Sequence, residues 1–202
     1  MKKLTSSLLS ALLLSASSTF AASISFNNIA SDFSTYMPIV DSSGAAISVN
    51  SGNVSIGYFT GNDATISGGD FSSFSSFASG NMNGGGYNYD GMFSLTGSGS
   101  IATGSSFIGE NIYSFITVGS EYLVVKSSTT FEIDNPVFGP EITIGTSVPG
   151  NTLLWGSVAT AGGDIGGGAV DAYQLVAVPE PSAYAALAGL LALGCVLLRR
   201  RA

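Results

Sequence analysis

Apolar and polar residues alternate over short runs through most of the chain, and glycine, serine and asparagine separate the runs. Residues 23–29 alternate with a period of two, which is typical of a half-buried β-strand. Residues 45–49 and 54–59 flank a four-residue polar turn and predict a hairpin. Similar runs follow at residues 92–96, 107–118, 121–127, 129–133, 141–144, 153–159 and 169–178. The pattern predicts an all-β fold, and we expect a single jelly-roll-like β-sandwich with one short helix.

One segment follows a different spacing. Phenylalanine recurs every three residues within residues 71–79, Asp70 precedes the segment, and Gly80 follows it. Aspartate is a favoured helix N-cap, and glycine is favoured just after a helix ends. We therefore expect a short amphipathic helix that closes one end of the sandwich. The alternative for these rings is an aromatic platform for sugars.

The N-terminal end has the three parts of a secretory signal peptide. Two lysines stand near the start, residues 4–16 are mostly leucine, alanine and serine, and small residues precede a cleavage site after Ala21. A cut after Ala22 would place the bulky Phe20 three residues upstream, so it is less favourable. We predict that residues 1–21 are a signal peptide, cleaved between Ala21 and Ala22. The alternative is a retained anchor, for which the apolar run is short.

The C-terminal end begins with an extended segment and continues as an apolar helix. The segment consists of Val178, Pro179, Glu180, Pro181 and Ser182. Two of its residues precede a proline, which favours extended backbone that a protease can grip. Residues 183–198 carry no charge and would form a helix of roughly 24 Å, somewhat shorter than a hydrocarbon core of about 30 Å. We predict a membrane helix over this run.

Three arginines, Arg199, Arg200 and Arg201, follow the apolar run. By the positive-inside bias they hold the C-terminus in the cytoplasm, so the domain at residues 22–177 lies outside. In order and contiguity, the motif, the helix and the basic end resemble the PEP-CTERM sorting signal of exported bacterial proteins, over residues 178–202 only. The resemblance implies that an exosortase, a membrane peptidase, recognises Pro179, Glu180 and Pro181 and cuts nearby. The alternative is an ordinary single-pass anchor after a proline-rich linker.

Basic residues are concentrated in the two ends of the chain. Lys126 is the only lysine or arginine between Ala22 and Val178, and the same interval holds twelve acidic residues, which gives a net charge of −11. This charge repels phosphate backbones and anionic lipids, so we expect no nucleic-acid partner. We assign the basic residues to targeting.

The residue types needed for common catalytic machinery are missing from the exported part. The chain has no histidine, and its one cysteine, Cys195, lies in the predicted membrane helix. Serine and cysteine triads, common zinc sites and disulfides are therefore excluded from the exported part. Four glutamates on or beside predicted strands could supply a carboxylate pair for glycoside chemistry, but their spacing selects no pair. They are Glu110, Glu121, Glu132 and Glu141. We predict no catalysis and no cofactor.

Two glycine-rich stretches, residues 81–91 and 161–168, predict loops, because glycine is costly to hold in regular structure. Neither stretch has the lysine of a phosphate loop or the acidic spacing of an EF-hand. Solvated turns are the favoured interpretation. The alternative is a Ca²⁺ site that uses Asn88 with Asp90, or Asp164 with Asp171.

Two functions from different classes remain open. The resemblance implies a structural or matrix component that is exported across the inner membrane and spans it once before processing. After processing, the protein would reach the cell surface or the extracellular space and associate with exopolysaccharide. The alternative is a carbohydrate-binding β-sandwich module in which Tyr87, Tyr89 or Trp155 stacks on sugar. An exposed concave face shared by these aromatics would favour the module. Trp155 stands in a predicted strand, and we expect it in the core.

Overall fold

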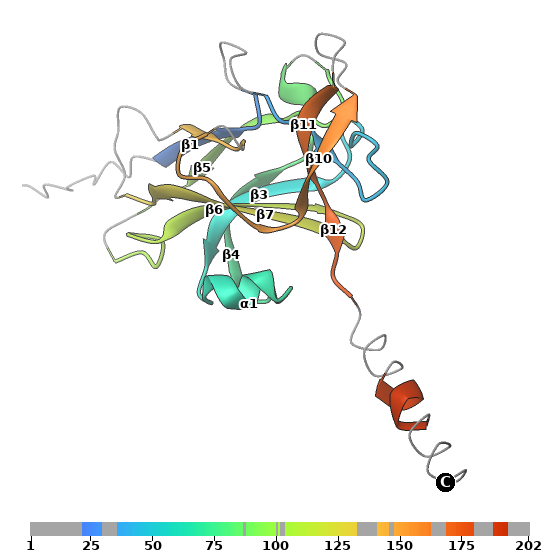
Figure 1. The fold of residues 1–202 in the computed structure, drawn as a ribbon. Helices are drawn as coiled ribbons and strands as arrows, with labels where there is room; N and C mark the ends of the chain where they lie inside the picture. The colour runs from blue at the N-terminus through green and yellow to red at the C-terminus, as the bar shows by residue number, and fades with distance from the viewer. Residues whose placement is uncertain are drawn as a thin grey trace, which may run out of the picture.

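A computed structural model describes residues 22–29, 36–86, 88–99, 101, 104–132, 141–145, 148–162, 169–179 and 188–193. Between residues 22 and 179 the described chain consists of strands in several sheets with only two short helical elements (Figure 1). The all-β fold that the alternating pattern predicts is therefore confirmed.

The strands pair in three sheets. They are β1 (Ala22–Asn27), β2 (Ile39–Val40), β3 (Asn53–Phe59), β4 (Phe74–Gly80), β5 (Ser94–Gly99), β6 (Asn111–Val118), β7 (Glu121–Thr130), β8 (Glu141–Thr143), β9 (Thr152–Trp155), β10 (Ser157–Gly162), β11 (Ala169–Gln174) and β12 (Val176–Ala177). The sheet orders are β5-β1-β8, β10-β11-β2 and β12-β7-β6-β3-β4, and β9 also pairs with β7. Most pairs are antiparallel, whereas β1 pairs with β8 and β11 with β2 in parallel. The helical elements are α1 (Asp63–Ser67) and the 3-10 turn η1 (Gly84–Gly86).

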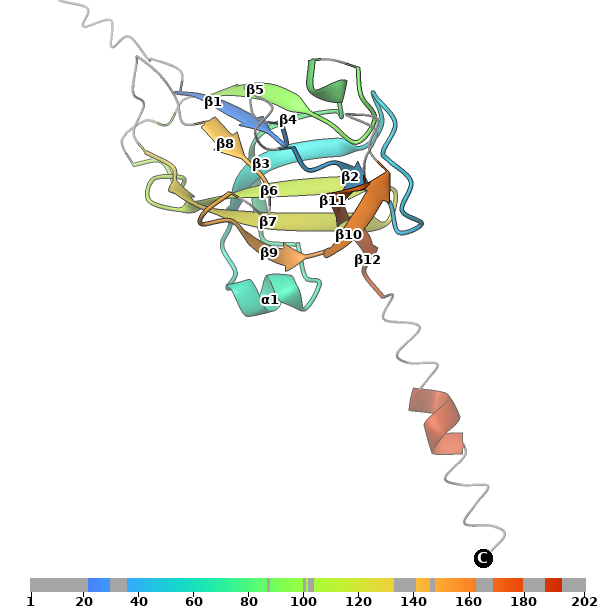
Figure 2. The same ribbon diagram turned by 45° about the horizontal axis from the view of Figure 1, so that its top comes forward.

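Buried side chains from all three sheets form one hydrophobic cluster. It includes Ile24, Phe26, Ile39, Ile56, Ile112, Ile116, Leu123, Ile142 and Tyr173. In two views, β1 and β5 lie on one side of β6 and β7, and α1 lies on the opposite side (Figures 1 and 2). The long sheet therefore has one face toward the cluster and another face toward α1.

The helix expected over residues 71–79 is wrong, because residues 74–80 form strand β4 against β3. A spacing of three places two strand residues on opposite faces of a sheet. Accordingly Phe74 contacts Phe59, whereas Phe77 contacts Phe107 and Phe131. The Asp70 carboxylate caps a turn by accepting hydrogen bonds from the Ser72 backbone and hydroxyl. Aromatic contacts with partners distant in sequence thus override a local helical spacing.

Other boundaries differ in detail from those expected. Residues 54–59 lie in β3, but residues 45–49 form no strand and contribute only a bridge from Ala46 to Val40. The runs 121–127 and 129–133 join in one strand, β7, which ends at Thr130. The run 153–159 divides at Gly156, whose positive φ of 112° turns the chain between β9 and β10.

The two ends of the chain are described only in part. The predicted signal peptide, residues 1–21, and the basic end, Arg199 to Arg201, lie outside the described residues. Within the predicted membrane helix, residues 188–193 are helical. Among the described residues, no helix has the length and apolar character needed to cross a membrane.

Candidate functional site

A polar cleft of about 640 Å³ opens beside α1, where the chain leaves β3 and passes over β6 and β7. Small-molecule sites in proteins have volumes of roughly 300–1,000 Å³, so the cleft is large enough for a ligand. Its polar lining residues are Asn62, Asp63, Glu110, Asn111, Tyr113 and Lys126. Residues from three separated parts of the chain thus meet in one place.

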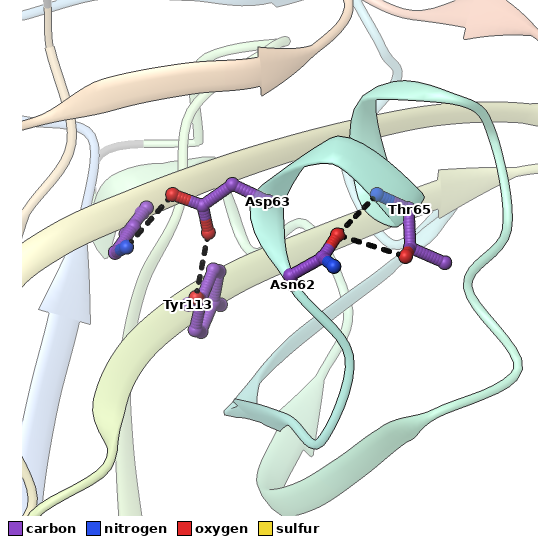
Figure 3. A network of polar contacts seen from close by, with 5 residues as sticks. Asn62, Asp63, Thr65 and Tyr113 are labelled. Atoms are coloured by element: carbon purple, nitrogen blue, oxygen red, sulfur yellow. Dashed lines mark hydrogen bonds and ion pairs between the residues drawn. The ribbon is translucent and has the colours of Figure 1, made fainter.

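Helix α1 positions the first two of these side chains. Asn62 is the N-cap, and its Oδ1 accepts hydrogen bonds from the backbone N–H and the hydroxyl of Thr65, each at 2.9 Å. This is the ordinary capping interaction of asparagine. Ile66 on the same helix is buried and anchors it to the fold. The cap and the anchor together hold Asp63 over the sheet (Figure 3).

The pairing of β6 with β7 positions the next two side chains. Tyr113 and Lys126 are cross-strand partners, so they project from the same face of the sheet. The Lys126 ammonium donates to Asp63 Oδ2 at 2.9 Å, and the Tyr113 hydroxyl donates to Asp63 Oδ1 at 3.1 Å (Figure 3). We call Asp63, Tyr113 and Lys126 the carboxylate network. It ties α1 to the middle of the sheet.

Tyr113 and Lys126 each stay in one protonation state at neutral pH. Burial raises the pKa of the Tyr113 phenol, and the negative charge of Asp63 raises it further. The hydrogen bond to Asp63 raises the pKa of the Lys126 ammonium. The tyrosine therefore remains neutral and the lysine remains charged, which makes the network a fixed frame of donors and acceptors.

Aromatic rings form the floor of the cleft. Phe59 and Tyr113 line it, are both buried, and meet edge to face with ring centroids 5.2 Å apart. The Phe59 ring also contacts Phe74 at 4.9 Å and Phe115 at 6.0 Å. The floor is therefore rigid and apolar, with the polar groups arranged around it.

Several polar groups of the cleft are unused. Among the described residues, the Glu110 carboxylate, the Asn111 amide and the Asn62 Nδ2 group have no hydrogen-bond partner within the protein. They combine carboxylate acceptors with amide donors. The cleft can therefore bind a ligand that both donates and accepts hydrogen bonds.

The three aromatics considered for sugar stacking are not brought together. Tyr87 lies outside the described residues. The Tyr89 N–H donates to the carbonyl of Gly84 in η1, whereas the Trp155 ring contacts Phe71 just after α1. Since η1 lies at the top and α1 at the bottom of both views, these two residues belong to opposite ends of the fold (Figures 1 and 2). Trp155, expected in the core, is partly buried and packs against the hydrophobic cluster from its border.

The four glutamates considered for catalysis have different surroundings. The Glu121 carboxylate accepts hydrogen bonds from the Ser42 backbone and hydroxyl, and Glu141 accepts one from Asn27 at 2.8 Å. Glu132 is exposed. Of the four, Glu110 alone lines the cleft. The structure therefore does not collect them in one site.

The residues considered for Ca²⁺ also have other surroundings. Asp90 Oδ1 accepts a hydrogen bond from the Val49 backbone at 2.8 Å, Asp171 is exposed on β11, and Asp164 lies outside the described residues. Within the described part of the chain, no three acidic, histidine or cysteine side chains gather in a way that could hold a metal ion.

The predicted processing sites border the strands. Ala21 lies outside the described residues, and Ala22 is the first residue of β1, where it pairs with Gly99. At the other end, Val178 is half-buried and Pro179 is exposed directly after β12. Glu180, Pro181 and Ser182 lie outside the described residues.

Comparison of the chain with family models, with curated proteins and with solved structures gives no match. The cleft therefore has to be judged on its own geometry. Sequence reasoning missed the carboxylate network. One signal pointed to it, because an isolated lysine in a strongly acidic domain usually has a carboxylate partner.

Proposed function

We propose that this protein is an exported cell-surface or extracellular-matrix protein that is sorted by its C-terminal tail. The observation that carries the proposal is the contiguous order of the motif Val178 to Ser182, the uncharged run 183–198 and the arginines 199–201. The signal peptide 1–21 directs export across the inner membrane. An exosortase-type membrane peptidase then recognises the motif, and the released protein associates with exopolysaccharide.

The boundaries of the strands support this proposal. Strand β1 begins at Ala22, and strand β12 ends at Ala177. Removal of both predicted signals would leave every described strand intact. Helical residues 188–193 expose Leu190, Leu191 and Leu193, with 58% to 67% of each side chain open, as expected of a helix that is made to face lipid.

The finer architecture belongs to the same proposal. We take residues 22–177 as one domain in which the sheets pack as a jelly-roll-like β-sandwich. The main hydrophobic cluster, to which all three sheets contribute, supports one domain. The role of the domain is structural, without catalysis. The lack of histidine anywhere in the chain supports that assignment.

A second candidate function is carbohydrate binding, which the polar cleft beside α1 favours. The cleft offers unused hydrogen-bond donors and acceptors in one place, on a base of buried aromatic rings. This arrangement suits sugars better than the three separate aromatics do. A matrix protein and a sugar-binding module are compatible, because association with exopolysaccharide requires a surface that holds it.

Replacing Pro179, Glu180 and Pro181 by alanine tests the sorting proposal. In cells that carry an exosortase, the variant should accumulate in the inner membrane at its full signal-processed length. The reason is that alanine continues a helix and removes the extended segment, while the apolar run stays intact. Processing at the wild-type rate would contradict the proposal and leave residues 183–198 as an ordinary anchor.

Two controls sharpen the result. The variant Pro149→Ala changes a proline outside the motif and should be processed like the wild type. Neutral replacement of Arg199, Arg200 and Arg201 should weaken the orientation of the helix without removing the motif. A host that lacks an exosortase should leave even the wild type uncut.

A further inference from the structure

The cleft beside α1 presents hydrogen-bonding groups that the fold does not use. The Oδ1 of Asn62 accepts the hydrogen bonds of the helix cap, and its amide nitrogen has no partner among the described residues. Glu110 and Asn111, at the start of β6, add a carboxylate and a second amide. Sugar hydroxyls donate and accept hydrogen bonds at once, so neighbouring hydroxyls match this mixture of groups.

From this geometry we propose that the cleft binds a segment of a neutral polysaccharide. Glu110 and Asn111 are the contact residues, and the Asn62 amide nitrogen, which lines the same cleft, donates a further hydrogen bond. The carboxylate network holds these residues in position and does not bind the sugar, because both oxygens of Asp63 already accept hydrogen bonds from Tyr113 and Lys126. The buried rings of Phe59 and Tyr113 form the packed base of the cleft, and the sugar is held by hydrogen bonds to its hydroxyls.

The charges of the cleft select a neutral polymer over an anionic one. Two carboxylates, Asp63 and Glu110, face one ammonium, and Lys126 is already paired at 2.9 Å. The surrounding exported part carries a net charge of −11. An anionic polysaccharide would meet repulsion without a free cation to compensate for it.

The lining also argues against a protein partner. Protein interfaces depend on exposed aromatic or apolar anchors that become buried. Phe59 and Tyr113, the rings of this lining, are only 3% and 5% exposed. The polar lining and the open shape suit a polysaccharide that binds weakly. Because a polysaccharide repeats the same unit many times, many weak contacts can together give sufficient affinity.

Affinity electrophoresis of the full signal-processed chain tests this inference. The chain is made in a host without an exosortase, so that its tail is retained, and is kept in a detergent that contains no sugar. Native gels contain hydroxyethylcellulose, galactomannan or dextran as neutral probes, with alginate as the anionic comparison. We expect at least one neutral polymer to slow the protein, and alginate to leave its mobility unchanged.

Variants locate the binding in the cleft. Glu110→Ala combined with Asn111→Ala should weaken the retardation by about tenfold, because two hydrogen bonds are lost. Glu110→Gln, which keeps the shape of the side chain, should weaken it by about threefold. Glu132→Ala, at an exposed glutamate outside the cleft lining, is the matched control and should bind like the wild type. Circular dichroism of each variant verifies that it is folded.

Three results would overturn the inference: no retardation by any of the neutral polymers, retardation by alginate alone, or undiminished retardation of the folded Glu110→Gln and double variants. The inference rests on the proposed association with exopolysaccharide, but its test does not involve processing of the tail. Loss of binding would leave the sorting proposal standing, and failure of sorting would leave the cleft unaffected.

Discussion

Lys126 illustrates how little composition says about the role of one residue. Charge counting set it apart as the only basic residue between Ala22 and Val178 but assigned it no contact. In the structure its ammonium is paired with Asp63 and lies 5.8 Å from the centroid of the Tyr113 ring. The lysine therefore connects α1 to strand β7.

Replacing Lys126 by methionine should have a modest effect on stability. The side chains of Lys126 and Asp63 are 25% and 46% exposed, and pairs of this kind contribute about 0.5–1 kcal/mol. We expect the free energy of unfolding in urea to fall by that amount, while Glu132→Ala leaves it unchanged. A fall of more than about 3 kcal/mol would show that the pair behaves as a buried one.

Alkaline pH should destabilise the protein through its buried tyrosines. Burial raises the pKa of Tyr173 from 10.0 to about 12, so folding favours the protonated phenol. That contribution is complete below pH 10 and is lost as the pH rises through the folded-state value, at a cost on the order of 2–3 kcal/mol. The raised pKa values of Tyr113 and Lys126 act in the same direction.

Urea unfolding over a series of alkaline pH values measures this effect. The free energy of unfolding should be level near neutral pH and should fall as the pH rises above 10. In Tyr173→Phe most of that fall should disappear, because phenylalanine does not titrate. An equal fall in the variant and the wild type would assign the effect to other groups.

At the scale of elements, the last strand depends on Trp155. Strand β12 pairs with β7 through two residues, and the Trp155 indole donates to the Val176 carbonyl at 2.9 Å. Gly69, with a positive φ of 85°, allows the indole and Val178 to approach so closely that a Cβ there would lie 3.1–3.2 Å from both. These contacts hold the chain in place as far as Val178. The exposed Pro179, the first proline of the motif, follows directly.

The variant Trp155→Phe should loosen β12 selectively. It removes a hydrogen bond worth about 1 kcal/mol and keeps an aromatic ring against Phe71. Hydrogen exchange at Val176 and Ala177 should accelerate by about fivefold. Exchange at Ala159 and Ala172, in the β10–β11 pair, serves as the internal control. Unchanged exchange in β12 would show that the β7 pairing alone holds the strand.

The elements that the sequence could predict are short apolar runs between turn residues. The runs that became β3, β6 and β7 were recognisable in this way, although burial does not alternate along them and β3 is buried on both faces. Strand β4 was mistaken for a helix because its phenylalanines serve both faces of the sheet, and only the partner strands reveal this. Helix α1 was missed because its five residues are too few to show a helical period.

At the scale of the whole molecule, the cleft could not be predicted from the sequence. Its residues are separated by about fifty positions, between α1 and the start of β6, and they meet only because the pairing of β3, β6 and β7 sets the register. Charge counting identified an isolated lysine but not its partner. The acidity of residues 22–177 and their lack of cysteine were readable directly.

The part of the chain between the two predicted signals should fold without metal or disulfide. Residues 22–178 contain no cysteine and no histidine, and the described strands share one hydrophobic cluster. We expect this fragment to give a β-type circular dichroism spectrum and a melting temperature that neither a reductant nor a chelator changes. A mainly helical or unfolded fragment, or one that melts earlier with the chelator, would contradict this expectation.

The central claim is that both ends are removed around a complete β domain. The most direct test is the intact mass of the mature protein recovered from cells that carry an exosortase. The mass should correspond to a chain that begins at Ala22 and ends close to the Pro179-Glu180-Pro181 motif, without residues 183–202. A mass that includes the arginines at 199–201, with the signal peptide removed, would contradict sorting and make the C-terminal run a permanent anchor.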